Sequence, residues 1–294
     1  MHKHTFPMAG LGLAIFALSA CSAGKKSPSS PSPLPQPNST INYTAIGASD
    51  AQAIGSSVEC IIPFADCPNG MGYVQVATRQ LKATGFAVNL TNLGIGTATL
   101  GRDFQDLGNQ NGHLVVANFV ENEAPVLNSN TTLITIFAGG NDVNVVTGAM
   151  GRGAGASDQI GYINAQIQAF GADYSTLLNL LRGRAPAARI VVLSLPNMGA
   201  MPFLAGASAS QRQAAQLLSV GMTTTVINPL TAQGVIVIDM MCDARSYQPA
   251  TYSSDGFHPG DVGYAWMAAE VVSAATTNYR SPQSSCAQMT LIPQ

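Results

Sequence analysis

Short runs of apolar and β-branched residues alternate along this chain with longer segments of helical pattern, and this alternation restricts the fold. The strand-like runs are residues 41–47, 86–94, 131–142, 188–197 and 235–240. The helical patterns cover residues 71–85, 160–184, 208–234 and 259–279. Strands separated by helices form a parallel sheet covered on both faces, with right-handed crossovers between neighbours. The sequence therefore predicts an α/β fold with about five parallel strands.

The N-terminus has the pattern of an export signal. A basic start, MHKHTF, precedes an apolar run over residues 7–20 that is too short to span a bilayer as a helix. The run ends in LSAC, which resembles the lipobox of bacterial lipoproteins, where the cysteine becomes the lipidated first residue. We expect residues 1–20 to be a lipoprotein signal peptide and Cys21 to carry the lipid. The alternative is an ordinary cleaved signal with an incidental cysteine. By the same resemblance, Ser22 in place of aspartate suggests the outer membrane.

The segment after Cys21 is rich in proline and serine and offers little apolar surface to bury. Such a composition favours an extended, solvated chain, so we expect residues 21–40 to be a tether. Residues 41–294 are enough for one α/β domain with a large core. Charged residues make up only 10% of the chain, and its net charge is −2. Because no basic block follows the tether, we expect no nucleic-acid partner. We also expect a monomer.

Four cysteines remain if Cys21 carries lipid. An even number in an exported chain suggests two disulfides, for which three pairings are possible. We favour Cys60–Cys67, which closes a loop with two prolines, and Cys242–Cys286, which ties down the C-terminal tail. Metal binding is the alternative, but the chain has no C-x-x-C and only four histidines, so we predict no metal site.

Small and polar residues gather where the predicted strands end. These residues are Ser49, Asn92, Gly94, Gly96, Asn141, Asp142, Pro196 and Asn197. Parallel sheets of this kind bind ligands outside the carboxyl ends of their strands. Turn formation explains any one of these residues, but the whole set indicates a functional site at this edge.

Ser49 lies in the break after the first strand, in the sequence GASD, and is a candidate nucleophile. A serine hydroxyl needs a base, usually histidine, within hydrogen-bond reach. Only His113 and His258 remain once the signal peptide is removed. His258 follows Asp255 by three residues, and a carboxylate beside an imidazole can fix its tautomer and stabilise its protonated form. His113 has no comparable partner, and we expect it at the surface.

Attack on a carbonyl creates a negatively charged oxygen. Preorganised N–H donors stabilise such an oxygen by roughly 2.7–4 kcal/mol each in the best-studied case. Asn141 could supply a side-chain N–H, while GIG at residues 94–96 and Ser49 could supply backbone N–H groups. For each residue by itself, turn formation remains the alternative.

These segments together resemble the SGNH, or GDSL-type, hydrolase family, with its sequence blocks in order across residues 44–258. GASD resembles the nucleophile block, NLGIGTAT the glycine block, GGND the asparagine block and DGFH the Asp-x-x-His block. The resemblance implies that the nucleophile, base and orienting acid are Ser49, His258 and Asp255. It implies that the oxyanion hole consists of Ser49, Gly96 and Asn141. It also implies a three-layer α/β/α sandwich with a flavodoxin-like parallel sheet, and no cofactor.

Two positions depart from the pattern of this family. The family has aspartate directly before the nucleophile, where this chain has Ala48, and Asp50 follows instead. A gapless match of the glycine block places the oxyanion glycine of the family at Thr97, whereas a shift by one residue places it at Gly96. Either backbone N–H could serve, and we predict Gly96. The role of Asp50 stays open.

We therefore expect an exported, lipid-anchored esterase or lipase that cleaves acyl or acetyl esters through an acyl-enzyme on Ser49. Its substrate would be a small-molecule, lipid or acylated-glycan ester, and acyl transfer to an alcohol is a close variant. The alternative from another class is a non-catalytic envelope lipoprotein that binds a glycan or lipid. A redox or nucleotide-binding protein would need a phosphate loop that the sequence lacks. The glycine-rich residues 147–159 are expected to form a mobile loop at the rim of the site.

Overall fold

The computed structural model describes residues 30–61 and 67–290. Its centre is a parallel sheet of five strands in the order β2-β1-β3-β4-β5. The strands are β1 (Thr40–Gly47), β2 (Ala87–Asn92), β3 (Leu133–Phe137), β4 (Arg189–Leu193) and β5 (Ile236–Ile238). This order is that of a flavodoxin-like doubly wound sheet. The predicted α/β fold is confirmed. Each observed strand falls inside its predicted run, except that β1 begins one residue earlier.

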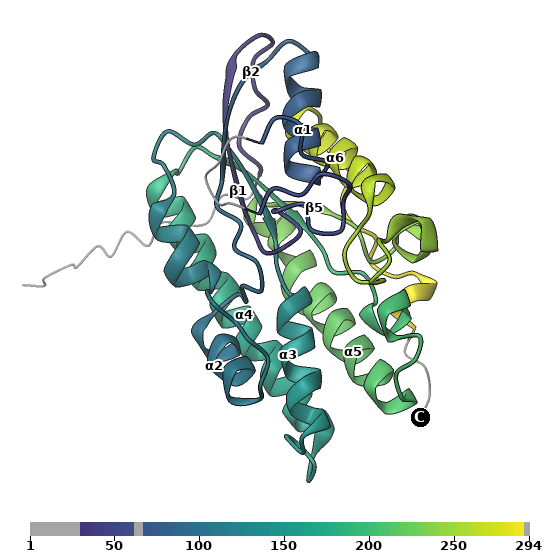
Figure 1. Ribbon diagram of the computed structural model, residues 1–294. Helices are drawn as coiled ribbons and strands as arrows, with labels where there is room; N and C mark the ends of the chain where they lie inside the picture. The colour runs from purple at the N-terminus through teal and green to yellow at the C-terminus, as the bar shows by residue number, and fades with distance from the viewer. Residues whose placement is uncertain (1–29, 62–66, 291–294) are drawn as a thin grey trace, which may run out of the picture.

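Helices cover both faces of the sheet, as Figure 1 shows. One face carries α1 (Tyr73–Ala83) and α6 (Asp261–Thr276). The other face carries α2 (Arg102–Gln110), α3 (Gly140–Gly151), α4 (Gln159–Arg184) and α5 (Ala209–Gly221). Each face has its own apolar core, so the molecule is a three-layer α/β/α sandwich. In the part of the chain that the structure describes, no helix is both long and apolar enough to cross a bilayer.

The helix predicted over residues 208–234 is regular only in its first half. After α5 the chain continues as a π-helical turn (Met222–Ile227) and a 3-10 helix (Asn228–Gln233). Pro229 has no backbone N–H, so it cannot continue the hydrogen bonds of an α-helix. Gly234, with a φ of 73°, then ends the segment.

Two helices were not predicted from the sequence. In α2 the buried residues are Phe104 and Gly108, so few apolar residues mark its inner face. The expectation of a loop over residues 147–159 is wrong for residues 147–151, which belong to α3. That helix buries a row of small apolar side chains, Val143, Val145, Val146 and Ala149. Their burial outweighs the low helix propensity of glycine.

The described end of the expected tether lies against the domain rather than in solvent. Ser32 donates from its hydroxyl to the carbonyl of Ala188 at 3.1 Å, and buried Arg189 donates to the carbonyl of Ser32 at 2.6 Å. The same guanidinium donates to the carbonyls of Ala274 and Thr277, each at 2.9 Å. A cation is also favourable at this C-terminal end of α6 because of the helix dipole. Arg189 therefore ties the N-terminal segment to β4 and α6.

The structure contains both expected disulfides, Cys60–Cys67 and Cys242–Cys286. A cross-link restricts the unfolded chain, more strongly when it closes a longer loop. The second bridge spans 44 residues, whereas the first spans 7. The longer bridge fixes the C-terminal segment beside the loop that follows β5.

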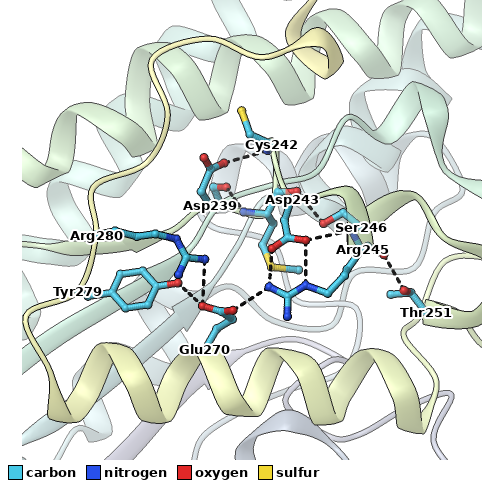
Figure 2. A network of polar contacts seen from close by, with 11 residues as sticks. Asp239, Cys242, Asp243, Arg245, Ser246, Thr251, Glu270, Tyr279 and Arg280 are labelled. Carbon is cyan, nitrogen blue, oxygen red and sulfur yellow. Dashed lines mark hydrogen bonds and ion pairs between the residues drawn. The ribbon is translucent and has the colours of Figure 1, made fainter.

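A network of polar contacts fixes the loop between β5 and α6 (Figure 2). Arg245 pairs through two nitrogens with Asp243, at 2.9 and 2.6 Å, and reaches Glu270 of α6 at 2.8 Å. Glu270 also accepts a hydrogen bond from the hydroxyl of Tyr279 in the C-terminal segment. Bidentate pairs of this kind are geometrically specific. The network therefore anchors the chain that leads into the DGFH segment.

We predict that Arg189→Met lowers the free energy of unfolding by about 3 kcal/mol, because three carbonyl groups, that of buried Ala274 among them, lose a charged donor. Urea unfolding of the oxidised chain would measure this change. Exposed Arg184 at the end of α4 provides the control, and Arg184→Met should leave the midpoint nearly unchanged. Equal midpoints for the two variants would contradict the anchoring role of Arg189.

Candidate active site

Ser49 lies where β1 breaks into a series of tight turns. The N–H of Ala51 donates to the carbonyl of Ala48, and the N–H of Ile54 donates to that of Ser49, both at 3.1 Å. The turn requires small residues, since a Cβ on Gly47 would lie 3.1 Å from the Cβ of Ala51. Ser49 is 9% exposed, so its hydroxyl lies at the floor of an opening rather than on the outer surface.

Asp255 and His258 come from one short loop that leads into α6. An antiparallel bridge between Tyr252 and Pro259 closes this loop. Gly256, with a φ of 69°, adopts the left-handed conformation that the turn needs and that glycine reaches without strain. The closed loop holds the carboxylate and the imidazole beside each other.

The two loops meet through a chain of two hydrogen bonds. Nε2 of His258 lies 2.8 Å from Oγ of Ser49. Nδ1 of His258 lies 2.6 Å from Oδ2 of Asp255. These are the distances that a nucleophile, its base and an orienting carboxylate require. The structure thus brings together the three residues that the sequence nominated as a triad.

The carboxylate of Asp255 accepts several hydrogen bonds besides that of the His258 ring. Its Oδ1 accepts from the hydroxyl of Ser253 at 2.8 Å and from the backbone N–H groups of Phe257 and His258 at 2.8 and 2.9 Å. Burial alone would raise the pKa of Asp255, but the hydrogen bonds outweigh it and lower this pKa to about 2. The carboxylate therefore stays ionised at neutral pH and can stabilise an imidazolium.

Asn141 reaches the same edge of the sheet from the first turn of α3. The strand predicted over residues 131–142 ends at Phe137, and Gly139, with a φ of 110°, lets the chain turn sharply into the helix. Nδ2 of Asn141 donates to the carbonyl of Ala98 at 2.8 Å. An amide nitrogen has two N–H bonds. This contact orients the amide while the second N–H remains able to donate to a substrate.

The glycine block follows β2 and packs against the nucleophile turn, where Asn92 donates from its amide to the carbonyl of Ala51 at 2.7 Å. Thr97 has a φ of 67°, a left-handed conformation that a β-branched residue rarely adopts. The gapless match with the hydrolase family placed a glycine at this position. The backbone conformation therefore favours Thr97 over Gly96 as the candidate N–H donor.

Asp142 connects the start of α3 to the glycine block. Its Oδ1 accepts the backbone N–H of Leu100 at 2.9 Å. Burial, only partly offset by this hydrogen bond, raises the pKa of Asp142 to about 7. Asp142, the residue after Asn141, therefore holds the start of α3 against the residues that follow the glycine block.

Two more carboxyl groups lie close to the nucleophile turn. Glu123 is buried and accepts the N–H of Gly47, at the end of β1, at 3.0 Å. Burial raises the pKa of Glu123 well above its usual range and also raises the pKa of Asp50. No sequence pattern pointed to Glu123, which lies far along the chain in a segment without periodicity.

A narrow apolar pocket of about 50 Å³ adjoins the site. Its lining includes Ala48, Ala98, Phe137, Leu195, Met201 and Phe257. The ring of Phe257 packs edge-on against the ring of His258, at 4.9 Å between centroids, and against that of Phe203 at 5.0 Å. These contacts limit the positions that the imidazole can adopt. Among residues 30–61 and 67–290, no group of three or more His, Cys, Asp or Glu side chains could hold a metal ion.

The flavodoxin-like sheet, the Ser–His–Asp contacts at its carboxyl edge and the nearby N–H donors are the features of a serine hydrolase with an α/β fold. A family model agrees with this class. The model for the GDSL-like Lipase/Acylhydrolase family matches residues 46–266, so the chain belongs to this family and is a carboxylic ester hydrolase.

Solved structures share the fold. An extracellular lipase from Streptomyces rimosus is 16% identical, with a TM-score of 0.56 over 81% of this chain and 100% of that chain. The lipase Lip_vut3 from a goat rumen metagenome is 18% identical, with a TM-score of 0.55 over 81% of this chain and 99% of that chain. No curated protein sequence matches the chain.

We predict that Asp142→Asn reduces the pH dependence of stability. With a pKa of about 7 in the folded state and 3.8 when unfolded, Asp142 keeps its proton in the fold while the unfolded chain releases it. The wild type should therefore lose up to about 4 kcal/mol relative to the variant as the pH rises from 4 to 8. Urea unfolding across this range tests it.

Exposed Asp106 on α2 serves as the control, and Asp106→Asn should retain the pH dependence of the wild type. A stability difference between the wild type and Asp142→Asn that does not change with pH would show that Asp142 is ionised throughout.

Proposed function

We propose that this enzyme hydrolyses carboxylic esters of short acyl groups through an acyl-enzyme on Ser49. The hydrogen bonds from Ser49 through His258 to Asp255 are the observation that carries the proposal. Of the two histidines outside the expected signal peptide, only His258 makes such contacts, and it makes both at once.

In this mechanism Oγ of Ser49 attacks the ester carbonyl while Nε2 of His258 takes the hydroxyl proton. The carbonyl oxygen becomes negative and accepts N–H donors from Asn141 and from the backbone of Ser49 and Thr97, or of Gly96. His258 then returns the proton to the departing alcohol, and the acyl group remains on Ser49. A water molecule, activated by the same imidazole, attacks the acyl-enzyme and releases the acid.

The small volume of the apolar pocket supports short acyl groups. About 50 Å³ accommodates only a few water-sized groups, whereas a fatty acyl chain is far larger. Large side chains in the lining, among them Phe119, Phe137 and Leu195, restrict the space in the pocket. Acetyl and propionyl esters therefore match it better than long-chain lipids.

We predict that p-nitrophenyl acetate is cleaved with a higher kcat/KM than the butyrate, octanoate and palmitate esters. Ser49→Ala and His258→Ala should each lower kcat by about 10⁴-fold or more, and the double variant should be no slower, because the two residues act as one unit. The control is Ser175→Ala on α4, whose hydroxyl only donates to the carbonyl of Gly171.

Turnover that persists in Ser49→Ala would refute the acyl-enzyme on Ser49. Absence of turnover on every ester, from a folded and oxidised sample, would favour the alternative of an envelope protein that keeps the fold to bind a glycan or lipid. A rate optimum at palmitate would refute the short-acyl assignment alone.

We also propose that the enzyme is exported and anchored by lipid on Cys21, with an outer membrane location. The support is the LSAC sequence after an apolar run, followed by Ser22. Several acyl chains, each contributing ~0.8 kcal/mol per buried methylene, make a durable anchor.

We predict that Cys21→Ser moves the enzyme from the membrane fraction to the soluble fraction of bacterial cells, whereas Ser22→Ala does not. Fractionation followed by immunoblotting measures this. An unchanged distribution of Cys21→Ser would contradict lipid anchoring.

A further inference from the structure

A second, larger depression lies next to the site just described. It has a volume of about 490 Å³, and its lining includes Asn144, Thr147 and Arg152 on or just after α3, together with His113, Phe203 and Gln211. We call it the α3 groove. Whereas the apolar pocket beside Ser49 is narrow, the α3 groove is wide and contains more polar side chains.

The α3 groove begins about one helical turn from the catalytic residues. Asn144 lies three residues after Asn141, and thus about one helical turn further along α3. On the opposite wall, Phe203 contacts the ring of Phe257, which itself contacts His258. A molecule whose ester carbonyl lies at Ser49 would therefore extend from the site directly into the groove.

The outer end of the groove carries a cation. Arg152 follows the last residue of α3 and is exposed, and its guanidinium forms no ion pair or hydrogen bond with any residue that the structure describes. His113, the other titratable residue of the lining, comes from the loop after α2, and no acidic side chain is among the described lining residues. An unpaired arginine in a groove without acids favours an anionic ligand, because a guanidinium binds carboxylate and phosphate groups with two parallel hydrogen bonds.

The floor of the groove includes backbone of α3 that no side chain covers. Gly148 and Gly151 of α3 both line it, and a Cβ at either position would meet nothing within 4 Å. Glycine within a helix costs roughly 0.5–1 kcal/mol relative to alanine. Packing within the protein does not demand either glycine. Their effect is to let a ligand approach the helix backbone closely.

We infer that the α3 groove binds the alcohol part of the ester and that this part is an acidic sugar chain, with Arg152 as a specificity-determining residue. The inference rests on the proposed ester hydrolysis at Ser49 and adds its substrate class. Polar side chains together with an aromatic ring, Phe203, suit the hydroxyl groups and the apolar faces of sugars.

The position of Arg152 distinguishes a sugar chain from a phospholipid. Arg152 lies 11 residues after Asn141, which is about 16 Å along the helix axis. The anion it binds is therefore several sugar units from the ester. In a glycerophospholipid the phosphate is only a few bonds from the ester oxygen, which is too close for an extended molecule in this groove.

The test compares acetate release from O-acetylated trigalacturonate, which is acidic, and from O-acetylated xylotriose, which is neutral. We expect the wild type to favour the acidic substrate. This preference is measured as the ratio of kcat/KM for the acidic substrate to kcat/KM for the neutral one. Arg152→Ala should lower the ratio by about tenfold, mainly through a higher KM for the acidic substrate. Arg152→Lys should restore part of the preference, and Arg184→Ala at the end of α4 is the control for loss of an exposed arginine.

A second variant tests the bare floor without changing charge. Gly148→Ala should raise KM for both oligosaccharides more than for p-nitrophenyl acetate, which is too short to fill the groove. Gly183→Ala on α4, where a Cβ also meets nothing within 4 Å, should have no such effect.

An unchanged substrate preference in Arg152→Ala, with Ser49-dependent cleavage of p-nitrophenyl acetate intact, would overturn this inference and leave the proposed function standing. Cleavage of phosphatidylglycerol vesicles that depends on Arg152, with no cleavage of either sugar acetate, would also overturn it and assign the groove to a lipid. Loss of Ser49 dependence on p-nitrophenyl acetate would instead refute the proposed function.

Discussion

The hydrogen bond between Ser49 and His258 joins two loops that are 209 residues apart in the sequence, and the arrangement of the site depends on it. A contact of 2.8 Å between such distant residues requires both loops to be fixed independently. The parallel sheet supplies the common frame, because β1 ends at the same edge at which the connection from β5 begins. Local contacts then place each side chain: tight turns around Ser49, and a bridged loop with four hydrogen bonds to one carboxylate around Asp255.

The supporting contacts run mostly from the backbone of one loop to a side chain of another. Asn92 ties the glycine block to the nucleophile turn, Glu123 holds the end of β1, and Asp142 holds the residues after the glycine block. Each of these polar groups is buried, where loss of a hydrogen bond leaves an unsatisfied partner and costs roughly 1–3 kcal/mol. The edge of the sheet is therefore rigid before any substrate arrives, which is the condition under which fixed N–H donors are effective.

Much of this arrangement follows from local sequence signals. The β-branched runs predicted all five strands, since burial on both faces leaves a nearly continuous apolar sequence. Ser49 and Asn141 were nominated because they belong to a set of small and polar residues at strand ends. Asp255 and His258 were nominated from their spacing and from the resemblance to the hydrolase family.

Other features depend on tertiary contacts that leave no local signal. The helix α2 is short and mostly polar, and α3 is rich in glycine, so neither is evident from its apolar residues; their packing against the sheet decides their structure. The left-handed backbone of Thr97 is unfavourable for its own residue type and is imposed by the surrounding loops, so residue preferences pointed to Gly96 instead. The contact between Glu123 and Gly47 links segments that sequence patterns do not relate.

The carboxyl groups around the site fall into two classes, and the difference has a physical consequence. Asp255 accepts hydrogen bonds from a partly exposed loop and has a lowered pKa, so it is negative at neutral pH. Burial raises the pKa of Asp50, Glu123 and Asp142, which favours their neutral forms. The imidazole of His258 is hydrogen-bonded to one carboxylate, that of Asp255, on the side of the ring away from Ser49. Because Asp255 stays ionised at neutral pH, it stabilises the imidazolium formed during catalysis.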